Sequence, residues 1–378
     1  MKLYSILRPY LLIIAVVLIS TIVLWLPFLL KSNGLSFLDI YKHYDGPLYV
    51  IPAKTFYNPS AIEKLHIEIK LPTKYFAAHL PLYPILIRTS KELIQLTGLR
   101  VNGLEYLKSM IGVNILATIG LVLFFYFFLN KFKLTKKPII LASVMLFLPR
   151  FLVIRSVGAP ESLFILLILM SLFFFEENKF WLAGLFGGLA TMTKAPGILL
   201  FAGYGLVFIE RLIKIKKFNW NWIGTLLIPL GLLIVFGIYS IQYGDFFAFF
   251  HGNASVPMPY IFSVFNWKAK WVGTAWLEDI LFYFFMYGLT VVYLKDSKYR
   301  SFFYFSLVFF VATIFIQHRD ISRYSLPLWP LALIAFEKFF TSKKFLIIFL
   351  ILLPAIFLYA WSFLSYNVMP ISDWAAFL

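Results

Sequence analysis

The sequence predicts an all-α polytopic membrane protein with about eleven transmembrane helices and with interfacial helices in two large external loops. Of its 378 residues, 61% are hydrophobic and only 13% are charged. Several apolar runs are long enough to cross about 30 Å of hydrocarbon as helices. We expect helices over residues 9–30, 104–129, 138–157, 160–175, 180–193, 196–209, 222–241, 277–294, 301–317, 324–340 and 345–364.

The first run and the short run at 180–193 raise the question of how each meets the membrane. Residues 11–30 are longer than the core of a signal peptide and lack an Ala-x-Ala cleavage site, so we expect a retained first helix. The run at 180–193 is short for a full span and pairs with 196–209 across the sequence TKAPG. We expect this hairpin to be tilted or partly re-entrant. The whole chain, 1–378, is predicted to form a single transmembrane domain.

The net charge of +17 lies in short clusters of Lys and Arg between the apolar runs. This pattern favours membrane orientation over nucleic-acid binding, because a nucleic-acid surface would need the charges along one polar face. With the N-terminus on the cytoplasmic side, four further clusters are cytoplasmic as well, as the positive-inside tendency predicts. They are residues 131–137, 211–217, 295–300 and 343–344.

Under this orientation, residues 31–103 form a first external loop and residues 242–276 a second one. Both are rich in aromatic residues, Pro and Asn, a composition suited to lying in the membrane interface. The unusual polar residues all fall in external segments or at external helix ends. They are Asp45, His79, Arg155, Glu161, Lys194, Asp245, His251, His318, Arg319, Asp320 and Arg323.

Several classes of chemistry are excluded by what the sequence lacks. It contains no Cys, so disulfides, thiolate metal sites and a cysteine nucleophile are impossible. It has neither a phosphate-binding loop motif nor a dinucleotide glycine fingerprint, which argues against a soluble nucleotide-using enzyme. Polar groups gathered on one outer face of a helical bundle instead suit a lipid-linked anionic substrate.

Asp45 is the candidate general base. A carboxylate held at the membrane surface between aromatic residues can act as a general base toward a hydroxyl. Gly46 and Pro47 would hold it in a tight turn. The alternative is that Asp-Gly-Pro is only turn chemistry.

Three further candidates for substrate binding lie in or after the first external loop. His79, in FAAHLPLYPILIR, can donate a hydrogen bond to a sugar or phosphate, or it can make a structural bond within the interface. Glu161 follows Pro160 as the start of a helix would, because negative charge suits a helix N-terminus. The functional alternative is that Glu161 faces a cavity and orients the substrate, with Arg155 nearby.

Lys194, in TMTKAPGILL, lies between two apolar runs. An ammonium there is costly unless it snorkels to an interface, pairs with a carboxylate or meets an anionic ligand. Both snorkelling and ligand binding remain open.

The last candidates are in QHRDISRYSLPLWP, which contains His318, Arg319 and Arg323. If this turn is helical, the two arginines share a face and can hold a phosphate between their guanidinium groups. The alternative is an ion pair within the segment between Asp320 and Arg323.

The order of these motifs resembles the GT-C superfamily of integral-membrane glycosyltransferases, and especially its PIG-V-like mannosyltransferase branch. The similarity covers most of the chain, although each motif alone is weak. Five patches carry it: HYDGPLYVIPAKTFY, HLPLYPILIR, GAPESLFILLILMSLFFF, WLAGLFGGLATMTKAPGILL and SRYSLPLWPL. The chain departs from the family pattern where Tyr44 replaces a Trp, His79 an aromatic residue, Lys194 an Arg, and Ala195-Pro196 a Ser-Asn pair.

The resemblance implies a GT-C-like fold and an inverting transfer of a hexose, with mannose the expected sugar. The donor would be a polyprenyl phosphate carrier, as in dolichyl phosphate mannose, and the acceptor a hydroxyl of a glycan, lipid or protein. Asp45 would be the base. The site would lie on the extracytoplasmic side of a prokaryotic plasma membrane, or in the ER membrane of a eukaryote.

We expect no cofactor and no obligatory metal, because Lys194, Arg319 and Arg323 supply positive charge for the phosphate leaving group. Asp39, Asp45, Glu278 and Asp279 leave a metal site open. Two rival functions share the composition: a transporter or flippase of lipid-linked sugars, and a non-catalytic membrane scaffold. A transporter would more often place ionisable residues at the bilayer midplane within inverted repeats, which the sequence does not show.

Overall fold

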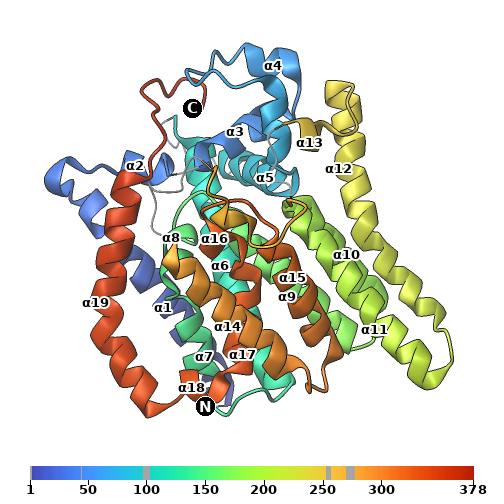
Figure 1. Ribbon diagram of the computed structural model, residues 1–378. Helices are drawn as coiled ribbons and strands as arrows, with labels where there is room; N and C mark the ends of the chain where they lie inside the picture. Colours follow the sequence, from blue (N-terminus) through green and yellow to red (C-terminus); the bar gives the residue numbers. More distant parts are fainter. Residues whose placement is uncertain (1, 44, 97–102, 253–256, 270–276) are drawn as a thin grey trace. The chain divides into compact units, whose positions relative to one another are not determined.

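The computed structural model describes residues 2–43, 45–96, 103–252, 257–269 and 277–378. These residues form α-helices and short 3₁₀ helices, and no β-strand occurs among them (Figure 1). Two isolated β-bridges join His43 to Val368 and Pro257 to Ile316. The prediction of an all-α protein is therefore confirmed for the described residues. Tyr44 and parts of both predicted external loops, 97–102, 253–256 and 270–276, lie outside them.

In the first half of the chain, the long helices α1 and α6 are separated by shorter helices. In order they are α1 Lys2–Leu29, η1 Ser32–Gly34, α2 Phe37–Tyr41, α3 Gly46–Thr55, α4 Pro59–Glu63, η2 Thr73–Ala78, α5 Leu82–Leu96, α6 Glu105–Lys131, α7 Pro138–Met145, α8 Pro149–Ile154, α9 Glu161–Glu176 and α10 Phe180–Thr193.

Helices from the second half alternate between long apolar elements and short connections. They are η3 Ala195–Ile198, α11 Leu199–Ile215, η4 Trp220–Leu226, α12 Leu227–Tyr243, α13 Ala248–His251, η5 Ser263–Phe265, α14 Glu278–Leu294, α15 Arg300–Ile314, α16 Ile321–Tyr324, η6 Leu326–Leu328, α17 Trp329–Ala335, α18 Glu337–Phe340 and α19 Lys343–Tyr366.

Five helical segments in the described residues are long and apolar enough to cross a membrane. They are Leu7–Leu29, Glu105–Lys131, Ala195–Lys214, Trp220–Tyr243 and Lys343–Tyr366. Their large apolar side chains are widely exposed, as on α19, where Ile348 and Leu350 are more than half exposed. Because such surfaces are rare on soluble monomers and normal toward lipid, the chain is a membrane-embedded helical protein.

Two predicted helices are wrong as continuous elements. The segment 138–157 divides into α7 and α8, which begins at Pro149. The segment 324–340 divides into four short pieces, with Pro327 and Pro330 each in the first turn of a new piece. Proline lacks a backbone N–H and disfavours helical geometry in the residue before it, so each proline starts a helix here and does not continue one.

The chain folds into two compact units, and each is described by itself. Unit 1 contains residues 1–166, 235–253 and 340–378, and unit 2 contains residues 167–234 and 254–339.

In unit 1, α6 packs against α1, α3, α5 and α7. The buried Asn114 of α6 donates from Nδ2 to the carbonyl oxygens of Ile154 and Val157, at 2.8 and 2.6 Å. Thr118, one turn further on, lies 2.7 Å from the hydroxyl of Ser162 in the first turn of α9. These contacts hold the connection between α8 and α9 against α6.

Unit 1 also joins distant segments of the chain. Lys74 Nζ and His251 Nδ1 both lie 2.8 Å from Asp245 Oδ2, so η2 is tied to α13. These contacts lower the pKa of Asp245 to about 2, with the hydrogen bond from Lys74 as the main cause. The segment after α19 also returns to the first loop, since Met369 N donates to Lys42 O at 2.9 Å.

In unit 2, α10 packs on η4 and the start of α12 through glycines. A Cβ atom added to Gly184 would lie 1.9 Å from Gly224 O, and one added to Gly188 would lie 2.5 Å from Leu227 O. Any larger residue at these two positions would push the backbones apart. Elsewhere in the unit α15 packs against α11 and α14, and α14 packs against α17.

Candidate functional site

Asp45 lies in the turn that starts α3. The turn is closed by the backbone: Gly46 N donates to His43 O at 3.1 Å, and Leu48 N donates to Asp45 O at 3.0 Å. Asp45 occupies the N-cap position and is half-buried, yet its side chain makes no capping hydrogen bond to the described helix α3. Both the catalytic role of Asp45 and its alternative as a turn residue stay predictions.

The Asp45 turn is packed against the turn that leads into α9. A Cβ atom added to Gly46 would lie 3.0 Å from Gly158 O and 3.5 Å from Gly158 Cα. Gly158 is itself covered by the side chain of Met110 in α6, which a Cβ atom there would meet at 2.4 Å. Two sequence motifs more than a hundred residues apart, HYDGP and SVGAPE, are thus in direct backbone contact within unit 1.

Aromatic side chains surround His79 beside this contact. Its ring lies 4.6 Å from the ring of Tyr49 in α3 and 5.8 Å from that of Tyr75, and the residue is only 5% exposed. The hydroxyl of Tyr57 donates to His79 O at 2.5 Å. His79 is therefore part of a buried aromatic wall on α3 and η2, not an exposed interfacial residue.

Glu161 is buried at the start of α9 and is close to Tyr83 of α5. Burial raises the pKa of Tyr83 well above its ordinary value, and the nearby Glu161 carboxylate raises it further. The Tyr83 hydroxyl donates to Met110 O at 2.7 Å, and its ring lies 5.1 Å from that of Tyr49. The structure thus gathers Asp45, His79 and Glu161 around α3, α5 and the connection that precedes α9.

Arg155 is fully buried and its donors are directed at other helices. Nη1 and Nη2 donate to Thr21 and Ser20 of α1, at 2.8 and 2.7 Å, and Nε donates to Leu146 O at 3.2 Å. These bonds join the end of α8 to α1. The substrate contact of Arg155 stays a prediction. The sequence shows that residue 155 is charged, but it does not show that its partners are residues of α1.

Arg150 is a cation that the sequence analysis did not single out. It is the second residue of α8, is 9% exposed and stacks its guanidinium 4.1 Å from the ring centre of Phe363. His43, two residues before Asp45, is another neighbour of that ring, at 5.5 Å between ring centres. The available signal was the position of Arg150 directly after a Pro that starts a helix, but this pattern does not reveal which Arg of FLPRFLVIR stacks on Phe363.

In unit 2, Lys194 lies at a break between α10 and η3. Its backbone is extended, its N–H still donates to Ala190 O at 2.9 Å, and its carbonyl accepts from Gly197 N at 2.9 Å. A Cβ atom added to Gly197 would lie 2.5 Å from Thr191 N, so the return of the chain requires a glycine. The two predicted runs are helical and are joined by a tight turn that carries a half-buried lysine. Their tilt or re-entrance stays a prediction.

The ammonium of Lys194 lies over the ring of Tyr324, at 5.8 Å from the ring centre. Tyr324 in turn lies 5.0 Å from the ring of His318. Two motifs that are far apart in sequence, TKAPG and HRDISRY, are therefore neighbours within unit 2. Sequence reasoning missed Tyr324, whose position is visible only once both motifs are placed.

The expectation that Arg319 and Arg323 share a helical face is wrong. α16 begins at Ile321 with Asp320 as its N-cap residue, so Arg319 lies in the bend before the helix and is exposed. The bend is held by Asp320 N, which donates to His318 Nδ1 at 3.0 Å. The Ser322 hydroxyl donates to the buried Asp320 carboxylate at 3.1 Å. These local bonds at the cap compete successfully with a continuous helix.

The described residues contain no group of three or more His, Asp or Glu side chains arranged to hold a metal ion. The prediction that no metal or other cofactor is required stays a prediction. The residues named as possible metal ligands from the sequence are not brought together as such a group.

No protein-family model matches the sequence, and no curated protein matches it. The resemblance to GT-C glycosyltransferases stays a prediction from the quoted motifs.

Proposed function

We propose that this protein is a GT-C-like membrane glycosyltransferase that moves a hexose from a polyprenyl phosphate carrier to an acceptor hydroxyl, with Asp45 as general base. Mannose is the expected sugar, and the expected side is extracytoplasmic. About eleven spans belong to this proposal. It is supported by five long apolar helices in the described residues and by shorter ones at Phe180–Thr193, Arg300–Ile314 and Leu326–Ala335.

One observation carries the proposal: the turn bearing Asp45 is in backbone contact with the turn at Gly158 that precedes Glu161. Both turns belong to the motifs on which the resemblance rests. Their contact within one compact unit supports a shared site and does not suggest two unrelated loops. A half-buried carboxylate that its own helix does not use for capping is a suitable base.

The reaction requires one proton acceptor and a stabilised leaving group. Asp45 takes the proton of the acceptor hydroxyl. At the same time the oxygen of that hydroxyl forms a bond to the anomeric carbon of the sugar. The bond from that carbon to the carrier's phosphate oxygen breaks, and its electron pair leaves with the polyprenyl phosphate. Attack from the side opposite the leaving group inverts the anomeric centre, so positioning and electrostatic stabilisation supply most of the rate enhancement.

Lys194 and Arg323 keep the role predicted for them from the sequence, which is contact with an anionic phosphate. Lys194 and His318 are brought together by the ring of Tyr324, and Arg323 is the residue before that tyrosine. An ammonium over an aromatic face keeps its charge while its stem is held in place, which suits contact with a phosphate oxygen. Arg319, which lies outside α16, is proposed as an outer contact only.

Transfer assays with the Asp45→Asn variant test this function. Membranes with the wild-type protein are expected to transfer labelled hexose from a polyprenyl phosphate donor, and Asp45→Asn is expected to lose about 10²–10⁴-fold in rate because the base is removed. Asp39→Asn is the matched control, since Asp39 Oδ2 accepts from Ser36 N at 2.8 Å and an amide oxygen can accept the same bond.

Two outcomes would contradict the proposal in different ways. Full activity of Asp45→Asn would remove Asp45 as the base while leaving the transferase. Absence of transfer by the wild-type protein from polyprenyl phosphate mannose, glucose and galactose, with transport of the lipid-linked sugar instead, would replace the transferase by a transporter.

A further inference from the structure

Six cations from two distant segments of unit 2 form a basic patch, defined here as Lys214, Lys216, Lys217, Lys295, Lys298 and Arg300. Three of them lie at the end of α11 or just after it. The other three lie in the connection from α14 to α15 or at the start of α15. The packing of α11 against α15 places these two segments at one end of the unit.

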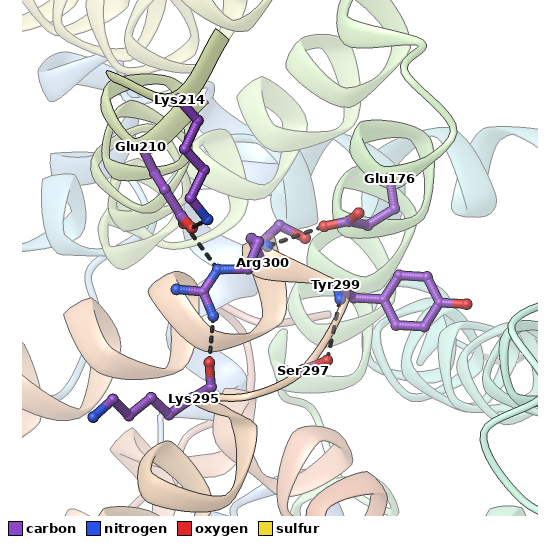
Figure 2. A network of polar contacts seen from close by, with 8 residues as sticks. Glu176, Glu210, Lys214, Lys295, Ser297, Tyr299 and Arg300 are labelled. Atoms are coloured by element: carbon purple, nitrogen blue, oxygen red, sulfur yellow. Dashed lines mark hydrogen bonds and ion pairs between the residues drawn. The ribbon is translucent and has the colours of Figure 1, made fainter. Parts of the chain in front are cut away.

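Glu210 of α11 joins the two segments. Its Oε1 lies 2.6 Å from Lys214 Nζ and its Oε2 lies 2.8 Å from Arg300 Nε (Figure 2). The Arg300 guanidinium also donates to Lys295 O, which closes the α14–α15 connection. The two oxygens of the Glu210 carboxylate therefore bind one cation from each segment, Lys214 and Arg300.

The second carboxylate in Figure 2 is used by the backbone. Glu176, the last residue of α9, accepts from Ser301 N at 2.9 Å in the first turn of α15. Lys216, Lys217, Lys295 and Lys298 are exposed around this framework, with Asp296 as the exposed carboxylate among them. Since Glu176 and Glu210 are occupied in the fold, the exposed surface carries an excess of positive charge.

The first of the two segments of the basic patch lies at the end of a candidate span. Two candidate spans, Ala195–Lys214 and Trp220–Tyr243, are joined only by residues 215–219. Phe218 and Trp220 beside the lysines are 53% and 76% exposed, and their rings lie 5.3 Å apart in an edge-to-face arrangement. Exposed aromatic rings next to the end of a span are typical of the headgroup region, where an amphipathic indole is most stable.

We propose that the basic patch is a binding site for the headgroup of an anionic phospholipid. The exposed lysines contact the phosphate, while Phe218 and Trp220 lie against the upper part of the acyl chains. Arg300 and Glu210 act as positioning residues, because they keep the α14–α15 connection beside the end of α11. The inference goes beyond the proposed function and does not depend on it.

Trp220 provides a local probe for this site. The protein is reconstituted with phosphatidylglycerol or phosphatidylcholine that carries the same brominated acyl chain, and fluorescence quenching is measured. The difference between the wild-type protein and Trp220→Phe isolates the contribution of Trp220 from the other nine tryptophans. We expect this contribution to be quenched at a several-fold lower mole fraction of brominated phosphatidylglycerol than of brominated phosphatidylcholine.

The variant Lys216→Gln/Lys217→Gln is expected to lose most of that preference, since each lysine near an anionic surface contributes roughly fivefold in affinity. Neither residue makes a side-chain contact that the fold requires in the described structure, and the unfolding temperature is measured to verify this. Lys343→Gln/Lys344→Gln, at the start of α19, is the matched control and is expected to keep the preference. Added salt should weaken it in the wild-type protein.

Three results would overturn the proposal. Equal quenching by the two lipids would show that the patch does not select an anionic headgroup. A preference that survives in Lys216→Gln/Lys217→Gln would place the lipid contact elsewhere. Quenching of Trp220 by aqueous iodide but by neither brominated lipid would show that this end of unit 2 is outside the membrane interface.

Discussion

The Asp45 turn of unit 1 and the Lys194 break of unit 2 present opposite charges by different means. Asp45 has a short side chain, and its position is set by backbone contact between Gly46 and Gly158. Lys194 has a long side chain that leaves a break between two helices and lies along the ring of Tyr324. The carboxylate is therefore positioned by main-chain packing, and the ammonium by a side-chain neighbour.

This difference indicates how each group should tolerate change. A short side chain on a rigid turn cannot compensate for an altered length, because the backbone that carries it has no room to move. A long side chain guided by a ring can adjust its torsions and keep its charge near the same place. Four experiments test this difference, in order of decreasing expected effect.

The largest contrast is expected between conservative substitutions of the two charges. Asp45→Glu should lose about 10²-fold in transfer rate, because one added methylene displaces the carboxylate by about 1 Å on a turn that cannot shift. Lys194→Arg should lose less than about tenfold, since a guanidinium also stacks on an aromatic face. Rates from a polyprenyl phosphate donor measure both. Equal losses would remove the distinction between the two regions.

The next experiment removes the ring beneath Lys194. Tyr324→Leu should weaken donor binding by roughly three- to tenfold, which corresponds to the loss of a partly exposed cation–π contact. Tyr324→Phe keeps the ring and is the matched control, with an expected change of less than about twofold. The donor KM is the measurement. A rise in KM that is as large for Phe as for Leu would point to the hydroxyl instead of the ring.

A third experiment tests the tight turn after Lys194. Gly197→Ala should destabilise the protein by about 1–3 kcal/mol, because the added Cβ would meet backbone atoms of Ala190 and Thr191 at 2.5–2.7 Å. Gly205→Ala, in the same unit, has no atom within 4 Å of its added Cβ and should be neutral or stabilising. Denaturation in detergent gives both values, and equal stability of the two variants would contradict a glycine requirement.

The smallest effect is expected for a contact within unit 1 between Glu68 of the first loop and the segment that follows α19. The Glu68 carboxylate accepts from the Ser372 hydroxyl and from the backbone N–H groups of Asp373 and Ser372, and these bonds lower its pKa to about 2. A lowered folded-state pKa means that this stabilisation is complete above about pH 4.5 and is lost as the pH falls toward 2.

The Glu68→Gln variant should therefore unfold at a slightly lower temperature than the wild type at pH 6, and the difference should shrink between pH 4.5 and pH 2. Glu63→Gln, which removes an exposed carboxylate of α4, is the control and should show no such convergence. A difference that stays constant with pH would assign the effect to packing and not to the charge of Glu68.

Much of the architecture was predictable because hydrophobic length is a strong local signal. The runs that became α1, α6, α12 and α19 were identified from composition alone, and so was the hairpin at Lys194. Prediction failed where proline and capping chemistry decide the backbone. The segments at 138–157 and 324–340 are mostly apolar, yet they break at Pro149 and around Pro327 and Pro330.

The site was less predictable than the fold because the sequence shows where charged residues occur but not which groups they contact. Arg155 and Arg150 lie five residues apart, but one donates to Ser20 and Thr21 of α1 and the other stacks on Phe363 beside His43. Arg319 and Arg323 have helical spacing but not a common helix. In each case the deciding contact is with a residue distant in the sequence, or with a cap.

By itself the sequence determined that this is an all-helical membrane protein with its polar residues between apolar runs, because the cost of burying charge in hydrocarbon acts on every residue independently. Only the tertiary structure decided which distant residues meet: Gly46 with Gly158 beside Asp45, and Lys194 with Tyr324. Such pairings depend on how helices far apart in the chain pack together, which no local pattern encodes.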